Sequence, residues 1–142
     1  MVKHTILLVD DSKADIELIR RSLSTGPGAP ELVVAEDGVE ALRILRSEPS
    51  RSSAKPDLIL LDLNLPRKSG HHVLVEIKQD PGFKHIPVVV FTSSSADRDI
   101  ATAYGSHANC YMTKPMDIDS FTAAMQAIES FWFSLVKLPS HR

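Results

Sequence analysis

The feature that most restricts the fold of this chain is a series of five short apolar segments. They occupy residues 5–10, 32–36, 57–62, 86–92 and 108–113, and segments with helical spacing of apolar residues separate them. Runs that are apolar on both faces are typical of strands in a parallel sheet covered by helices on each side. The sequence therefore predicts a doubly wound α/β fold with a five-stranded parallel sheet and five alternating helices.

Capping and turn residues indicate where the first helices begin and end. Ser12 and Asp15, three residues apart, form a capping-box pattern that opens a helix over residues 13–24, and residues 26–30 (GPGAP) end it. A second helix begins after Asp37-Gly38. The polar residues 47–56, rich in serine and proline, are interpreted as a surface insertion because such a segment cannot pack a core.

Length and composition exclude several classes of protein. The chain has 142 residues, 43% of them hydrophobic and 24% charged, which fits one ordinary globular domain. Its formal net charge of −2 gives no basic surface for nucleic acid. The apolar run 6–9 ends too early for a signal peptide, and no run reaches the ~20 residues of a membrane span. We expect a cytoplasmic protein that binds neither nucleic acid nor a membrane, with the single cysteine, Cys110, as a structural thiol.

Chemically distinctive residues follow four of the five predicted strands. The carboxyl ends of parallel strands meet at one edge of the sheet, where ligands bind. Each residue alone could be a helix cap, a turn residue or a solvated side chain. Their common edge favours a functional site. In chain order these residues are Asp10 and Asp11, Asp62, Thr92 and Ser93, and Lys114 and Pro115.

Three aspartates at one edge would repel one another unless a cation lay between them. At ~4 Å and an effective dielectric constant near 20, each pair costs about 4 kcal/mol. Carboxylates without a histidine or cysteine companion favour Mg²⁺, which is typically shared with a phosphate. Lys114 would add a positive charge and Thr92 a hydroxyl donor, both suited to a phosphoryl oxygen. The pattern predicts a site that places a phosphoryl group on a carboxylate.

Five separated motifs resemble the receiver domains of two-component response regulators. They are LLVDD (7–11), LILLDLNLP (58–66), Gly70, PVVVFTSS (87–94) and YMTKP (111–115). The resemblance spans about residues 4–130 and implies a flavodoxin-like, CheY-like sheet with strand order 2-1-3-4-5. It also implies a phosphoacceptor that takes its phosphoryl group from a sensor histidine kinase and later loses it by autodephosphorylation, with no other enzymatic activity.

The same resemblance implies a role for each site residue. Asp62 would be the phosphorylated residue. Thr92 would move toward the phosphoryl group, Lys114 would contact it, and Tyr111 would turn inward as the Thr92 shift allows. The face formed by the fourth helix, fifth strand and fifth helix would change with them, and the peptide bond before Pro115 would be cis. The implied ligands of Mg²⁺ are Asp10, Asp11, Asp62 and the backbone carbonyl of Asn64.

Two alternatives share some of these features. A phosphatase of the haloacid-dehalogenase kind also uses an aspartyl phosphate and Mg²⁺, but it needs a second aspartate two residues after the nucleophile, where Asn64 stands. An adaptor could keep the fold without phosphorylation, although the complete set of site residues argues against it. His71 and His72 follow a turn glycine without metal-ligand spacing, and we interpret both as surface residues.

The carboxyl-terminal part has a narrower resemblance, over about residues 108–139, to single-domain regulators that partner phytochrome-type histidine kinases. We expect one receiver domain over residues 1–142 with an extended helix and tail at about 117–142. On a helical wheel Trp132 joins the core-facing stripe, Phe131 lies at its margin, and Phe133 falls roughly 120° from its centre. This placement predicts that another molecule covers Phe133, either in a homodimer through the fourth helix, fifth strand, fifth helix and the three aromatics, or in kinase docking.

Overall fold

The structure is a computed structural model that describes residues 3–47 and 55–139. Within these residues five parallel strands form one sheet in the order β2-β1-β3-β4-β5, which confirms the predicted topology. Most of the insertion predicted at 47–56 lies outside the described residues. The strands are β1 (Thr5–Val9), β2 (Glu31–Ala35), β3 (Leu58–Leu61), β4 (Val88–Thr92) and β5 (Cys110–Thr113).

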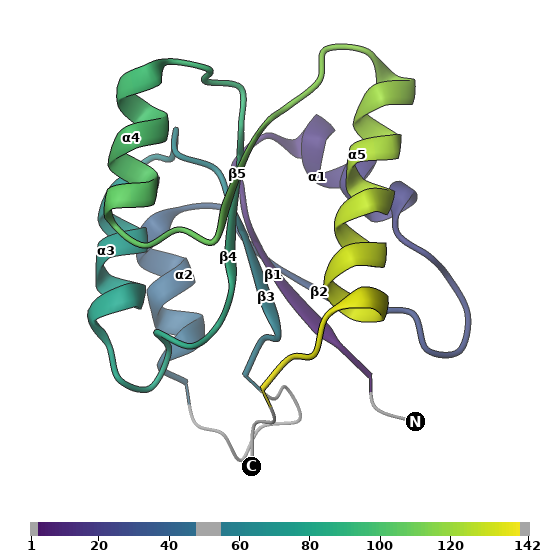
Figure 1. Ribbon diagram of the computed structural model, residues 1–142, viewed down its shortest axis with the longest axis horizontal. Helices are drawn as coiled ribbons and strands as arrows, with labels where there is room; N and C mark the ends of the chain where they lie inside the picture. The colour runs from purple at the N-terminus through teal and green to yellow at the C-terminus, as the bar shows by residue number, and fades with distance from the viewer. Residues whose placement is uncertain (1–2, 48–54, 140–142) are drawn as a thin grey trace.

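Helices cover both faces of the sheet (Figure 1), with α1 and α5 on one face and α2, α3 and α4 on the other. The first helix ends at Ser22, two residues before its predicted end, because Leu23 adopts an extended backbone. A π-helical turn, η1 (Phe131–Leu135), continues α5. The helices are α1 (Lys13–Ser22), α2 (Gly38–Leu45), α3 (Gly70–Gln79), α4 (Asp97–Gly105) and α5 (Ile118–Ser130).

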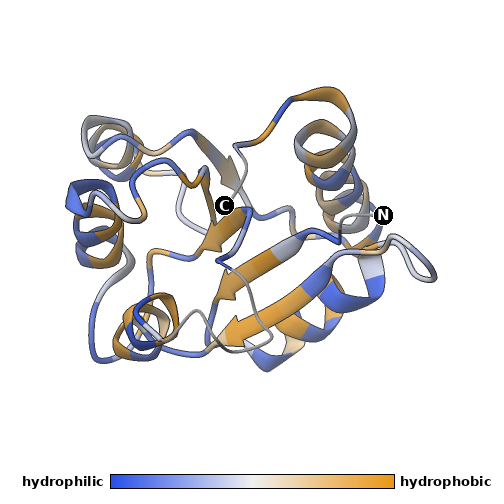
Figure 2. Cartoon of the chain, turned by 90° about the horizontal axis from the view of Figure 1, so that it is seen from below, coloured by the Kyte–Doolittle hydropathy of each residue, from blue (hydrophilic) through white to orange (hydrophobic). Residues whose placement is uncertain are grey.

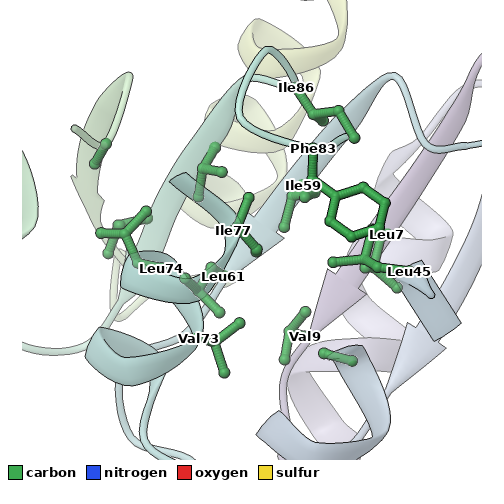
Figure 3. Packing of buried hydrophobic residues seen from close by; sticks show 14 of the residues in the cluster. Leu7, Val9, Leu45, Ile59, Leu61, Val73, Leu74, Ile77, Phe83 and Ile86 are labelled. Atoms are coloured by element: carbon green, nitrogen blue, oxygen red, sulfur yellow. The ribbon is translucent and has the colours of Figure 1, made fainter. Parts of the chain in front are cut away.

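Side chains of the central strands alternate between two hydrophobic clusters, as the period of a strand requires. In β1, Leu7 and Val9 pack toward α2 and α3 (Figure 3), whereas Ile6 and Leu8 pack toward α1 and α5. The strands are accordingly apolar over most of their length, while the helices alternate between polar and apolar residues (Figure 2). Burial on both faces is the reason why the strands read as continuous apolar runs.

Most helices of the described chain begin at a side-chain cap, which fixes where each strand-to-helix loop ends. The exception is α4, where Ala96 at the N-cap position supplies no side-chain bond. The capping box predicted at α1 is only half formed. Ser12 Oγ accepts from the backbone N–H of Asp15, but the Ser12 N–H donates to Asp10 Oδ1, 2.9 Å away, rather than to Asp15. The caps are Ser12, Asp37, Ser69 and Asp117.

The placement of Phe133 on the helical wheel is wrong. In the π-helical turn the Val136 N–H donates to the Phe131 carbonyl five residues earlier, at 3.1 Å, so the residues no longer follow 100° steps. Phe133 is half-buried against the cluster under α1 and α5, and its ring stacks on His4 with centroids 4.4 Å apart. This chain itself therefore covers much of Phe133. Trp132 is half-buried against the same cluster, and Phe131 is exposed.

Candidate metal and phosphoacceptor site

The carboxyl ends of β1 and β3 bring three aspartates together. Asp10 and Asp62 are buried, with 1% and 6% of their surfaces exposed, and Asp11 lies exposed beside them. One carboxylate oxygen from each lies within 4.8 Å of the other two. These hard oxygen donors fit a divalent cation, whose charge would relieve their mutual repulsion. The structure thus brings together the three carboxylates that the sequence assigned to one metal site.

Lys114, directly after β5, reaches this cluster from the other side. Its Nζ lies 2.8 Å from Oδ2 of Asp10, 2.8 Å from Oδ2 of Asp15 and 3.1 Å from Oδ2 of Asp62. An ammonium has three N–H donors, so each carboxylate can take one. Only 7% of the Lys114 side chain is exposed. Lys114 is therefore a buried cation held between three carboxylates.

Opposing effects set the charges of Lys114 and Asp10. Burial is the largest single effect and disfavours the ammonium, but the hydrogen bonds to Asp10 and Asp15 and the negative charges of Asp10 and Asp62 together raise the pKa of Lys114 above its usual value. For Asp10, burial is the largest effect and raises the pKa of the carboxyl, although the hydrogen bond from Lys114 works in the other direction. The lysine is thus firmly protonated, while the ionised form of Asp10 is disfavoured.

Asp15 is a partner of Lys114 that sequence reasoning missed. The sequence assigned it to the capping box of the first helix, because serine and an acidic residue stand three positions apart. Its side chain instead points to the sheet edge and is 30% exposed. The available signal was its position in the first turn of α1, directly after the acidic pair, where a side chain can reach the carboxyl ends of the strands.

Both oxygens of the Asp62 carboxylate have hydrogen-bond partners. The hydroxyl of Thr92, which is fully buried, donates to Oδ1 at 2.7 Å, and the Asn64 N–H donates to the same atom at 3.2 Å. Oδ2 faces Lys114. Ser93, the other hydroxyl that the sequence placed here, is exposed next to Thr92. These contacts orient Asp62 at the point where β3 ends.

Tyr111 is already half-buried with the carboxylate unmodified. Its hydroxyl donates to the Ser94 carbonyl at 2.9 Å, and its ring packs against the cluster under α2, α3 and α4. The sequence led us to expect this arrangement only after Thr92 had shifted toward a phosphoryl group. The Thr92 hydroxyl donates to the unmodified Asp62 carboxylate. Thr92 and Tyr111 therefore both make these contacts without phosphorylation of Asp62.

The prediction of a cis peptide bond before Pro115 is wrong, because every peptide bond in the described part of the chain is trans. The trans form is favoured by about 0.5–1 kcal/mol even before proline. With this bond trans, Lys114 still contacts its three carboxylates.

A second correction concerns His71, which is not a surface residue. It is half-buried, and its Nε2 lies 3.1 Å from Asp99 Oδ1. His72 is exposed, as expected.

Fold and site together define a class of protein: an α/β phosphoacceptor module with an acidic cation site at the carboxyl edge of its sheet. Residues 6–126 match the profile of the response regulator receiver domain. The chain is 46% identical over 136 residues to the response regulator Rcp1 of Synechocystis sp. (strain ATCC 27184 / PCC 6803 / Kazusa), a match that covers 95% of this chain and 92% of that protein.

Two solved structures resemble the whole molecule. The phosphorylated cyanobacterial phytochrome response regulator RcpA has a TM-score of 0.92 at 46% identity, covering 98% of this chain and all of that one. The Mn²⁺-bound form of Rcp1 has a TM-score of 0.88 at 46% identity, covering 96% of this chain and 99% of that one.

The chain belongs to the response regulator receiver family and is a two-component response regulator. In its described residues no helix is long and apolar enough to cross a membrane.

Proposed function

We propose that Asp62 accepts a phosphoryl group from a phosphohistidine of a sensor histidine kinase. An Asp62 oxygen attacks phosphorus as the bond from phosphorus to the imidazole nitrogen breaks, and the imidazole leaves. The observation that carries this proposal is the position of the buried Asp62 carboxylate, within 4.8 Å of Asp10 and Asp11 and in hydrogen-bond contact with Lys114 and Thr92.

The metal in this proposal is Mg²⁺, held by the carboxylates of Asp10, Asp11 and Asp62 and by the backbone carbonyl of Asn64. When bound, Mg²⁺ would neutralise charge on the phosphoryl oxygens. Lys114 holds a positive charge within 3.1 Å of Asp62 Oδ2, and its raised pKa keeps that charge at neutral pH. Thr92, with Ser93 beside it, supplies a hydroxyl donor.

Phosphorylation would then change the balance of contacts around Asp62. The group adds about −1.5 to −2 charges, which attract Lys114 and the Thr92 hydroxyl more strongly than the carboxylate does. Tyr111 is hydrogen-bonded to Ser94, two residues after Thr92, and to Tyr104 of α4, and we propose that it transmits the change to the face formed by α4, β5 and α5. Autodephosphorylation would return the molecule to its first state.

The partner in this proposal is a phytochrome-type sensor histidine kinase, as the names of RcpA and of the bacteriophytochrome response regulators AtBRR and RtBRR suggest. We propose that the two proteins meet in the cytoplasm. We also propose a homodimer through the α4–β5–α5 face and the aromatic residues Phe131, Trp132 and Phe133. Exposed apolar side chains in α4, around the start of α5 and in η1 support it: Tyr104, Met116, Ile118, Phe131 and Leu135. Phe133 contributes least, because it already packs within the chain.

The test is incubation with Mg²⁺ and acetyl phosphate, read by intact mass. We expect one phosphoryl adduct in the wild type, none when EDTA removes the metal, and none in Asp62→Asn. An adduct that persists in Asp62→Asn would contradict the assignment of the phosphoacceptor. No adduct in the wild type would favour a phosphorylation-independent adaptor, and continued release of phosphate from many donor molecules per protein would favour a phosphatase.

A further inference from the structure

We propose that His71 and Asp99 are positioning residues that fix the amino end of α4 and, through Ser94, hold Tyr111 in its half-buried position. This inference rests on the proposed function for the role of Tyr111 as the residue that reports phosphorylation. It adds a link from α3 to the switch, which neither the sequence motifs nor the site around Asp62 contain. Below, the His71–Asp99–Ser94 bonds are called the polar clamp.

The polar clamp and the bond from Tyr111 to Ser94 together connect two helices, one strand and one loop. The Tyr111 hydroxyl donates to the carbonyl of Ser94, and the Ser94 hydroxyl donates to Asp99 Oδ2 at 2.5 Å. The other oxygen of the same carboxylate, Oδ1, faces His71 Nε2 at 3.1 Å. The bonds join β5, the loop between β4 and α4, the first turn of α4 and the first turn of α3. A displacement of His71 can therefore reach Tyr111 through these hydrogen bonds, and a displacement of Tyr111 can reach His71.

The two ring nitrogens of His71 have different surroundings. Nδ1 is buried and has no hydrogen-bond partner in the described residues, whereas Nε2 faces a carboxylate, which can only accept. Nε2 with a proton can donate to Asp99 Oδ1, 3.1 Å away. The polar partner of the half-buried ring is therefore Asp99, and this one bond orients the side chain.

Asp99 is held from both sides in its charged form. Hydrogen bonds from Ser94, the larger effect, and from His71 lower the pKa of Asp99 below its usual value. Hydrogen bonds to a charged group are stronger than neutral ones. The Asp99 carboxylate thus joins the β4–α4 loop to α3 by two hydrogen bonds, one through each oxygen.

The rest of α4 is weakly fixed, which gives these polar bonds their importance. Its only buried side chain is Ala103, near the carboxyl end, whereas α3 buries Gly70, Val73, Leu74 and Ile77. The amino end of α4 also begins at Ala96 without a side-chain cap. With so little apolar burial, the position of the first turn depends on the bonds that Asp99 makes.

The first experiment measures Tyr111 directly, in protein without a phosphodonor. Protein labelled with 3-fluorotyrosine gives resonances for Tyr104 and Tyr111 in ¹⁹F NMR, assigned with Tyr111→Phe. In His71→Ala and Asp99→Asn we expect the Tyr111 resonance to shift toward that of a solvated ring, because loss of a hydrogen bond to a charged group changes the ratio of buried to exposed Tyr111 by about tenfold. His71→Gln, whose amide N–H replaces that of Nε2, should restore the wild-type position.

Matched controls lie near two of the clamp residues, His71 and Asp99. His72→Ala changes the exposed neighbour on α3, and Asp97→Asn removes another exposed carboxylate in the first turn of α4. Neither should move the Tyr111 resonance. Equal spectra for His71→Ala and His72→Ala in folded protein would overturn the proposal. If circular dichroism shows that His71→Ala does not fold, Asp99→Asn and Ser94→Ala are compared with the wild type instead. A Tyr111 resonance that is unchanged in both of these variants would also overturn the proposal.

The second readout is the rate of adduct formation with acetyl phosphate. The clamp holds Tyr111 in the arrangement in which Thr92 already contacts Asp62, so His71→Ala should form the adduct several-fold more slowly than His72→Ala, with recovery in His71→Gln. Equal rates would contradict the link to the switch. If the wild type forms no adduct, the proposed function fails, while the NMR comparison still decides whether the clamp positions Tyr111.

Discussion

Buried charge is what distinguishes the site from the rest of the molecule. Asp10 and Asp62 are buried at the sheet edge, and one ammonium, that of Lys114, serves both of them and Asp15. One positive charge cannot balance three carboxylates, with Asp11 as a fourth nearby. The cluster is therefore electrostatically unfavourable as it stands, and a bound divalent cation would relieve the imbalance.

Replacing Asp10 by Asn should stabilise the metal-free protein. The pKa of Asp10 in the folded protein is raised above the unfolded value of 3.8. The folded state therefore binds a proton at Asp10 more tightly than the unfolded state does. Ionised Asp10 consequently lowers the free energy of unfolding at every pH above its folded pKa. We expect Asp10→Asn to raise the free energy of unfolding by roughly 1 kcal/mol at pH 7. The advantage should shrink as pH falls through the folded pKa, and urea unfolding at several pH values measures it.

Added Mg²⁺ provides the complementary measurement. It should raise the unfolding midpoint of the wild type by mass action, and it should do so much less in Asp10→Asn, which lacks one metal ligand. Asp119→Asn, an exposed acidic change in the first turn of α5, is the control and should follow the wild type. A metal-free Asp10→Asn protein less stable than the wild type would contradict this account.

At the level of helices and loops, Gly70 sets how closely α3 approaches the end of β3. A Cβ at this position would lie 2.2 Å from the backbone oxygen of Asp62 and 2.5 Å from Leu63 Cα. Both are backbone atoms, so neither can move without displacing the segment that carries Asp62. The Gly70 N–H also donates to the Leu63 carbonyl at 3.0 Å. The amino end of α3 therefore packs directly against the chain beside the phosphoacceptor.

We expect Gly70→Ala to lower the free energy of unfolding by about 1–3 kcal/mol, the usual cost of overpacking, and to slow adduct formation on Asp62. The control is Gly105→Ala at the end of α4, where a Cβ would meet nothing within 4 Å. There alanine should be neutral or stabilising by up to about 1 kcal/mol, because it favours helix. Urea unfolding of both variants compares them, and equal effects would argue against a close approach at Gly70.

These elements also show what a sequence can and cannot predict. The strands and their order followed from segments apolar on both faces and from family motifs, and the site residues followed because parallel strands end at one edge. The errors involve contacts between distant segments. Asp15 contacts Lys114, His71 contacts Asp99, and Phe133 contacts His4. For His71 and Phe133 no local pattern encodes the partner, whereas the position of Asp15 after the acidic pair was a usable signal. The π-helical turn also broke the spacing on which the helical wheel depended.

In the whole molecule, the stacking of Phe133 on His4 ties the carboxyl-terminal turn to the segment just before β1. The ring planes lie 12° apart, and such pairs contribute about 0.5–1.5 kcal/mol beyond their buried area. We expect His4→Ala to speed hydrogen exchange of the amides in η1 several-fold, since their opening depends on this contact. Lys3→Ala, at the exposed neighbouring position, should leave exchange unchanged. Unaltered exchange in His4→Ala would show that the stack does not hold the turn.

The proposed homodimer makes opposite predictions for two phenylalanines of this turn. Phe131 is 47% exposed, whereas Phe133 packs within its own chain. If the exposed apolar side chains form the interface, Phe131→Ala should weaken self-association at least about fivefold, because a central aromatic in an interface contributes about 1 kcal/mol or more. Phe133→Ala should instead lower the free energy of unfolding and affect association less.

Sedimentation equilibrium with urea unfolding separates these two effects, with Ser134→Ala, an exposed change in the same turn, as the matched control. A wild type that stays monomeric at high concentration, both with and without acetyl phosphate and Mg²⁺, would contradict the homodimer and leave kinase docking as the role of Phe131. A dimer that Phe133→Ala disrupts more than Phe131→Ala would mean that the carboxyl-terminal turn rearranges on association. In that case the contact with His4 would be broken as the dimer forms.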